Sequence, residues 1–231
     1  MADFSLVHRV QPARSGHAPH PGLLLLHGRG TDENDLLPLS AELDDRLFVV
    51  AARAPLAFPW GGYMWYNLDS QGVGFPDPQD LQRSLDLLRR FIQEIVAAYP
   101  IDLRRLYVGG FSMGATMSAS LTLVEPERVA GAMVLSGYLP LQAGLHFRPS
   151  DAANHPIFQA HGTWDQVIPV AFGRQTRDYF AQTPVDLTYR EYPAGHEIGF
   201  SELRDLSDWL TGVLEEGRKE GHATLSTQNG D

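Results

Sequence analysis

Residues 106–119 read LYVGGFSMGATMSA, and this stretch decides the fold. Its apolar start predicts a buried strand, and the small residues that follow the turn predict a helix. A sharp turn between the two raises the Ser112 hydroxyl above the edge of a sheet, and Gly110 and Gly114 allow strand and helix to approach each other. Ser112 is therefore the first candidate functional residue.

Short apolar runs alternate with segments of helical period along the rest of the chain. This alternation is typical of an α/β fold, a mostly parallel sheet with helices on both faces. Most runs are apolar throughout, as in strands that are buried on both sides. The expected strands are residues 4–10, 22–27, 47–51, 106–110, 131–136, 156–161 and 187–192.

Two apolar stripes at helical spacing predict helices that cover the sheet. One stripe predicts a helix from about residue 80 to residue 98, and the other predicts a last helix around residues 203–213. No internal repeat, linker or inserted lid domain divides the chain. We expect one α/β domain over residues 1–216 and a flexible tail over residues 217–231.

Composition and charge exclude several classes of protein. The formal net charge of −10 argues against a nucleic-acid partner, and the lack of cysteine excludes disulfides and thiol nucleophiles. The longest strongly apolar run, residues 23–26, is far shorter than the roughly 20 residues that span a bilayer, and residues 1–20 contain no apolar signal segment. We expect a cytoplasmic protein without stable membrane association. A homodimer stays an open alternative.

His196 is the best candidate for a base that activates Ser112. It lies in YPAGH, residues 192–196, between the last expected strand and the last expected helix. In hydrolases that carry their nucleophile on such a turn, the chain order is serine, acid, histidine. The other downstream histidines fit less well, because they precede the acid, end an earlier strand or lie in the tail: His146, His155, His161 and His222.

Asp165 is the preferred acid. It lies in HGTWDQVIP, residues 161–169, after the strand that precedes the last one. A turn residue or a helix cap is its alternative role, since Pro169 can start a helix. Asp151 and Glu191 are the reserve candidates, one in a loop of uncertain placement and one inside an expected strand.

A serine nucleophile also needs amide donors for the oxyanion of its tetrahedral intermediate. One is the amide of the residue after the nucleophile, Met113. The other is expected from the turn after the strand of residues 22–27, where Arg29 is the first choice and Gly28 the next. We interpret His27 as a structural hydrogen-bonding residue.

Together these segments resemble the phospholipase/carboxylesterase family of α/β-hydrolases. The similar pieces are LHGRG, GGFSMG, HGTWDQVIP and GHEI, and they follow the family's order over residues 22–200. The resemblance implies Ser112 as nucleophile, Asp165 as orienting acid and His196 as base, with the Arg29 and Met113 amides as oxyanion hole. Two positions depart from the family: Met113 stands where many members have glutamine, and Arg29 where many have a hydrophobic residue.

The residues and the resemblance both predict a serine carboxylesterase for small esters with short- to medium-chain acyl groups, without metal or cofactor. An acyl-protein thioesterase or lysophospholipase with the same triad is one alternative, and a non-catalytic binding module on a hydrolase scaffold is another. Trp65, Tyr66 and Ile168 are the candidate pocket residues. Residues 59–66 form an expected pocket wall, with core packing of Trp60 and Trp65 as an equal alternative.

Overall fold

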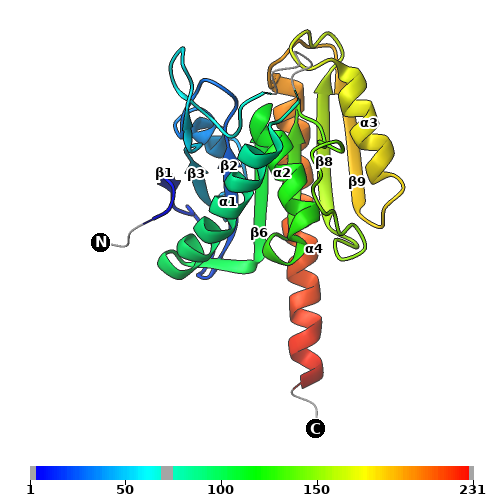
Figure 1. Ribbon diagram of the computed structural model, residues 1–231. Coiled ribbons are helices and arrows are strands. Elements are labelled where there is room, and N and C mark those ends of the chain that lie inside the picture. The colour runs from blue at the N-terminus through cyan, green and yellow to red at the C-terminus, as the bar shows by residue number, and fades with distance from the viewer. Residues whose placement is uncertain (1–3, 69–74, 229–231) are drawn as a thin grey trace.

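The computed structural model describes residues 4–68 and 75–228, with side chains up to residue 216. Seven of the described strands form one sheet in the order β1-β3-β2-β6-β7-β8-β9 (Figure 1). Strand β1 is antiparallel to β3, and the other neighbours are parallel. The sheet strands are β1 (His8–Gln11), β2 (His20–Leu26), β3 (Phe48–Ala52), β6 (Ile101–Phe111), β7 (Gly131–Leu135), β8 (Pro156–Gly162) and β9 (Asp186–Tyr192).

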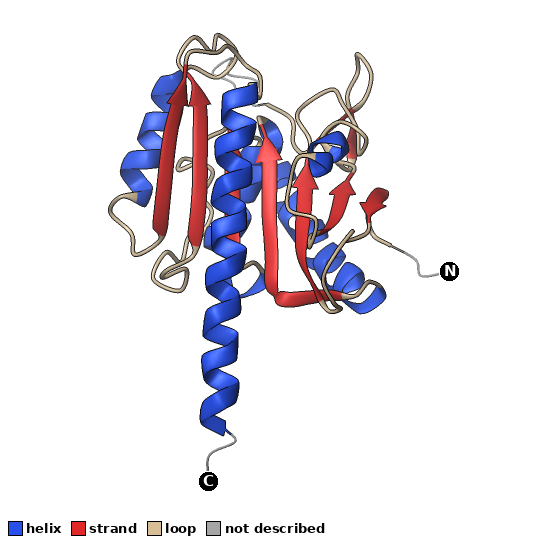
Figure 2. Cartoon of the chain, turned by 180° about the vertical axis from the view of Figure 1, so that it is seen from behind, coloured by secondary structure: helices blue, strands red, loops and turns tan. Residues whose placement is uncertain are grey.

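Helices cover both faces of this sheet. They are α1 (Pro78–Ala98), α2 (Met113–Val124), α3 (Val170–Phe180) and α4 (Phe200–Gln228), with short 3-10 turns at Leu37–Ala41 and Pro126–Arg128. Helices α1, α2 and α3 lie on one face, and α4 runs along the other, where it stands in front of the sheet in Figure 2. The α/β fold class with a mostly parallel sheet is therefore confirmed.

Helices α1 and α2 form for different physical reasons. Helix α1 buries one apolar stripe, and the Asp77 side chain accepts hydrogen bonds from the Gln79 and Asp80 amides at its start. Helix α2 is buried on all sides, because its small residues let it lie directly against the sheet. Two of its hydroxyls donate within the helix, Ser118 Oγ to the Gly114 carbonyl at 2.9 Å and Thr122 Oγ1 to the Ser118 carbonyl at 2.8 Å.

Several features differ from the sequence expectations or extend them. The first strand covers residues 8–11 rather than 4–10, and a small antiparallel hairpin of β4 (Leu56–Ala57) and β5 (Tyr63–Met64) was not predicted. The backbone of α4 continues to Gln228, through most of the expected tail. The domain boundary at residue 216 stays a prediction. Among the described helices, none has the length and apolar character needed to cross a membrane.

Candidate active site

Ser112 lies at the turn between β6 and α2, with φ 56° and ψ −116°. A positive φ is rare for a residue with a side chain, and such strain costs about 1–3 kcal/mol. A Cβ on Gly110 would come within 2.2 Å of the Gly114 backbone, and a Cβ on Gly114 within 1.8 Å of the Leu26 carbonyl oxygen. Glycine at both positions therefore lets the turn close against β2, and the turn presents the hydroxyl at the carboxyl edge of the sheet.

Three predicted side chains meet in a line at this edge. The Ser112 Oγ lies 2.9 Å from His196 Nε2, and His196 Nδ1 lies 2.7 Å from Asp165 Oδ2. Because a carboxylate only accepts hydrogen bonds, Nδ1 carries the proton that it donates to Asp165, and Nε2 is left to accept from the hydroxyl. The Phe111 ring packs against the imidazole, with 4.8 Å between the ring centroids.

The loops that carry the acid and the base are held together through their backbones. The Trp164 amide donates to the Ala194 carbonyl at 3.0 Å. Gly162 precedes the acid loop, and a Cβ there would come within 2.2 Å of the Gly195 carbonyl oxygen. Close contact between the two loops therefore requires a glycine at this position.

Two backbone amides and a neighbouring histidine hold the Asp165 side chain in place. Its Oδ1 accepts from the amides of Val167 and Ile168, at 2.8 and 2.9 Å, and the residue is only 6% exposed. His161 lies beneath it, with Nε2 3.5 Å from Asp165 Oδ2 and 2.8 Å from the Ile168 carbonyl oxygen. Burial lowers the pKa of His161, so this imidazole is neutral at pH 7. Sequence reasoning set His161 aside as a base and missed this supporting position, which its place four residues before the acid could have indicated.

The reserve acids lie in other environments. Glu191 forms a bidentate ion pair with Arg174, and hydrogen bonding to that guanidinium lowers the pKa of Glu191 to about 2. Asp151 accepts from Arg148 at 3.2 Å. Neither side chain is within hydrogen-bonding distance of His196.

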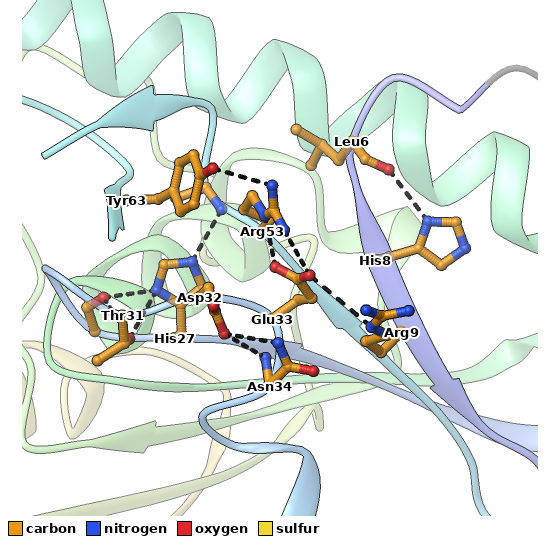
Figure 3. Close-up of polar contacts among 12 residues, drawn as sticks. Leu6, His8, Arg9, His27, Thr31, Asp32, Glu33, Asn34, Arg53 and Tyr63 are labelled. Carbon is orange, nitrogen blue, oxygen red and sulfur yellow. Dashed lines mark hydrogen bonds and ion pairs between the residues drawn. The ribbon is translucent and has the colours of Figure 1, made fainter. Parts of the chain in front are cut away.

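The turn after β2 lies beside the serine. Figure 3 shows the polar contacts of His27, which set the direction of this turn. His27 Nε2 accepts from the Ala54 amide at 3.0 Å, so Nδ1 carries the proton and lies 2.6 Å from the Gly28 carbonyl oxygen. Thr31 Oγ1 lies 3.1 Å from the same oxygen. In a trans peptide the carbonyl and the next amide point in opposite directions. The Arg29 amide therefore points away from His27.

Gly28 and the cavity lining place this turn against the nucleophile. A Cβ on Gly28 would lie 3.5 Å from the Ser112 Cβ, and Arg29, Ser112 and Met113 line one cavity. Met113 is the first residue of α2, where backbone amides have no partner inside the helix.

A buried ion pair fixes the chain just beyond this turn (Figure 3). Glu33 is 2% exposed, and Arg53 donates to both of its carboxylate oxygens, at 2.6 and 2.7 Å. The hydrogen bonds from Arg53 lower the pKa of Glu33. Arg53 also donates to the Tyr63 hydroxyl at 3.0 Å, so the pair joins the turn to β3 and to β5.

The cavity in front of Ser112 is mostly apolar. Three aromatic side chains, Phe75, Tyr138 and Phe172, pack against one another at centroid distances of 5.4–6.5 Å, with Phe75 in T-shaped contact with the other two rings. Tyr66 and Ile168, both expected in the pocket, line it as well. The rest of the lining is Leu68, Val167 and Pro169.

Trp65 corrects the pocket expectation. It is fully buried in the core, where its indole N–H donates to the His27 carbonyl at 2.9 Å, and it does not line the cavity. Trp60 lies in the loop between β4 and β5 and is 85% exposed. The expected pocket wall therefore contains one tryptophan in the core and one on the surface.

The profile of the Phospholipase/Carboxylesterase family matches residues 9–214. The chain belongs to this family. Its members are α/β-hydrolases that act on ester bonds, so the α/β-hydrolase fold expected from the sequence is confirmed. The family assignment agrees with the contact between Ser112 and His196 described above.

Several relatives within the family cover most of the chain. Acyl-protein thioesterase 1 of Mycosarcoma maydis is 30% identical over 87% of this chain and 94% of that protein. Acyl-protein thioesterase 1 of Candida albicans is 27% identical over 90% of this chain and 99% of that protein. The carboxylesterase of Bacillus cereus superposes with a TM-score of 0.80 at 25% identity, over 90% of this chain and 94% of that one.

Proposed function

We propose that the chain is a serine carboxylesterase in which Ser112, His196 and Asp165 form the catalytic triad. The observation that carries this proposal is the continuous pair of contacts from the Ser112 hydroxyl through His196 to Asp165. The family membership and the strained turn at Ser112 support it.

Acylation begins when His196 Nε2 takes the proton of the Ser112 hydroxyl while Oγ attacks the ester carbonyl carbon. Asp165 keeps the imidazole in the required tautomer and stabilises the imidazolium that forms. The amides of Arg29 and Met113 donate to the oxyanion, and each such donor supplies about 3–4 kcal/mol. His196 then returns the proton to the departing alkoxide, and an acyl-enzyme and a free alcohol result.

Deacylation repeats these steps with water. His196 takes a proton from a water molecule, whose oxygen attacks the acyl-enzyme carbonyl, and the same amides stabilise the second oxyanion. Collapse of the intermediate returns the proton to Ser112 Oγ and releases the carboxylic acid. No step requires a metal or an organic cofactor.

Substitution of Ser112 by alanine tests the proposal. Turnover of a para-nitrophenyl ester should fall by at least about 1,000-fold, while the far-UV circular dichroism and the unfolding midpoint stay close to those of wild type. The matched control is Ser207→Ala on α4, which removes a hydroxyl that donates to the Glu42 carbonyl and should leave turnover unchanged. Wild-type turnover in Ser112→Ala would contradict the proposal.

We propose that the preferred substrates are esters with short to medium acyl chains. The cavity beside Ser112 is bounded by three packed aromatic rings, those of Phe75, Tyr138 and Phe172. A series of para-nitrophenyl esters from acetate to palmitate measures the preference. Best kcat/KM on the longest chains would contradict it.

A second candidate is hydrolysis of thioesters or lysophospholipids with the same triad. The names of the relatives from Candida albicans and Mycosarcoma maydis favour a thioesterase. An oxygen ester and a thioester with the same acyl group distinguish a carboxylesterase from a thioesterase, because a thioesterase should have the higher kcat/KM on the thioester. A non-catalytic binding module would turn over neither.

A further inference from the structure

Arg29 is the one charged residue in the described lining of the cavity. The other lining residues are aromatic, aliphatic, methionine, serine or proline side chains. Its backbone lies in the turn beside Ser112, and its side chain is exposed to solvent. A cation therefore stands at the entrance of an otherwise apolar cavity, in a chain whose net charge is −10.

The Arg29 side chain is held in place by stacking. Its guanidinium carbon lies 5.4 Å from the centroid of the Phe58 ring, which meets the Trp60 ring edge to face at 5.1 Å. The Gly30 amide donates to the Tyr63 carbonyl at 2.8 Å, so the turn and the hairpin that carries Phe58 move together. Stacking on an aromatic face orients a guanidinium while its N–H groups stay available.

No acidic residue neutralises this cation within residues 4–68 and 75–216. The nearby acids have other partners: Glu33 pairs with Arg53, and Asp35 accepts from Thr31. The positive charge also acts on the cavity interior. Burial raises the pKa of the Tyr66 hydroxyl, and the charge of Arg29 opposes that rise.

We propose that the Arg29 guanidinium binds a carboxylate of the substrate, so that the enzyme prefers esters that carry a carboxylate a few bonds from the scissile carbonyl. This inference rests on the proposed esterase function. In the proposed mechanism the backbone amide of the same residue donates to the oxyanion, so the substrate carbonyl and the substrate carboxylate would be recognised one side-chain length apart. The apolar part of the substrate occupies the aromatic cavity. Guanidinium and carboxylate can form two parallel hydrogen bonds, which favours this anion over a neutral group.

Two matched pairs of esters test the proposal and distinguish the position of the carboxylate. In the first pair the acyl group carries it: mono-para-nitrophenyl glutarate is compared with para-nitrophenyl pentanoate. In the second pair the alcohol carries it: the acetate ester of para-hydroxybenzoate is compared with that of para-hydroxybenzamide. The measured quantity is the ratio of kcat/KM for the charged ester to that for the neutral ester.

In at least one pair this ratio should fall about tenfold or more from wild type to Arg29→Met, and Arg29→Lys should keep part of it. A ratio taken within each variant cancels general losses of rate. Arg90→Met, which removes an exposed arginine of α1 outside the cavity lining, should keep the wild-type ratio.

A measurement on the wild-type enzyme gives a test that does not depend on a variant's folding. Salt screens the attraction, so the same ratio should fall as sodium chloride is raised from low concentration to about 1 M. Ratios that are unaffected by salt and equal in wild type and Arg29→Met, in both pairs, would overturn the inference. If wild type hydrolyses none of the four esters, the proposed function itself fails.

Discussion

His27 shows how one buried side chain can set the direction of an amide that it does not contact. Its ring joins the Ala54 amide to the Gly28 carbonyl, and the peptide that follows then turns the Arg29 amide the opposite way. Burial lowers the pKa of His27, so the ring stays neutral and keeps one donor and one acceptor nitrogen. In the proposed mechanism His27 is therefore a positioning residue for the oxyanion hole.

His27→Ala should lower kcat about tenfold to hundredfold, less than the loss of an oxyanion donor itself, because the Arg29 amide is freed rather than removed. The matched control is His8→Ala. It also removes two hydrogen bonds, to the Leu6 carbonyl and the Tyr99 hydroxyl, but at the far edge of the sheet. Steady-state kinetics of both variants, with their unfolding midpoints, make the comparison. An equal kcat in the two variants would contradict the role given to His27.

The candidate site depends on loops that follow parallel strands. Strands β2, β6, β8 and β9 end at one edge of the sheet, and the loops after them carry the Arg29 turn, Ser112, Asp165 and His196. The loop that carries Asp165 and the loop that carries His196 are in direct contact, because Gly162 lies against the Gly195 carbonyl.

Gly162→Ala should separate the acid loop from the base loop. The new Cβ would lie 2.2 Å from the Gly195 carbonyl oxygen, so one backbone must move and the contact between Asp165 and His196 lengthens. We expect kcat to fall by at least about tenfold. In the matched control Gly199→Ala, the new Cβ meets no atom within 4 Å, and kcat should stay near wild type. Similar kinetics in the two variants would contradict this account of the loops.

The sequence predicts the strands of the sheet and the long helices, but it misses the short hairpin. Strands such as β7 are apolar throughout, and their positions were predicted within a few residues. The hairpin of β4 and β5 has two residues per strand, too few to show an alternating pattern. Trp60 and Trp65 stand in one aromatic stretch, yet one is exposed and the other buried. Only the path of the chain, set by distant contacts, separates them.

The candidate site was predicted more completely than its supports. Ser112, Asp165 and His196 are marked by glycines, strand ends and chain order, all of which are local signals. Arg53 acts through an ion pair with Glu33, twenty residues earlier in the chain, for which a single sequence has no pattern, whereas His161 is marked only by its place four residues before Asp165. The role of Arg53 therefore follows only from the folded structure.

For the whole molecule, buried ionisable groups link stability to pH. Glu202 is 1% exposed in the first turn of α4, and burial raises its pKa to about 7. The folded state therefore favours the neutral carboxyl. Its contribution to stability is fully present below the ordinary pKa of 4.5 and is lost as pH rises from 4.5 to 7. Above pH 7 the charged group costs about 3 kcal/mol.

Glu202→Gln should raise the free energy of unfolding by about 3 kcal/mol at pH 8, and this gain should shrink as pH is lowered toward 5. The lowered pKa values of His27 and His161 reduce stability below pH 6.5 in both proteins, so they cancel in the difference. Urea unfolding at several pH values gives the result. The exposed Glu197→Gln is the control and should show no such trend. A gain that does not change with pH would contradict the burial argument.

In the proposed mechanism the geometry around Ser112 makes its hydroxyl a nucleophile, and labelling with a fluorophosphonate measures that reactivity. After incubation with the probe and proteolysis, mass spectrometry should find one adduct, on the peptide that contains Ser112. Labelling should be absent in Ser112→Ala and slowed by at least about 100-fold in His196→Ala. An adduct on another residue, or no adduct in a wild-type enzyme that hydrolyses esters, would contradict the account.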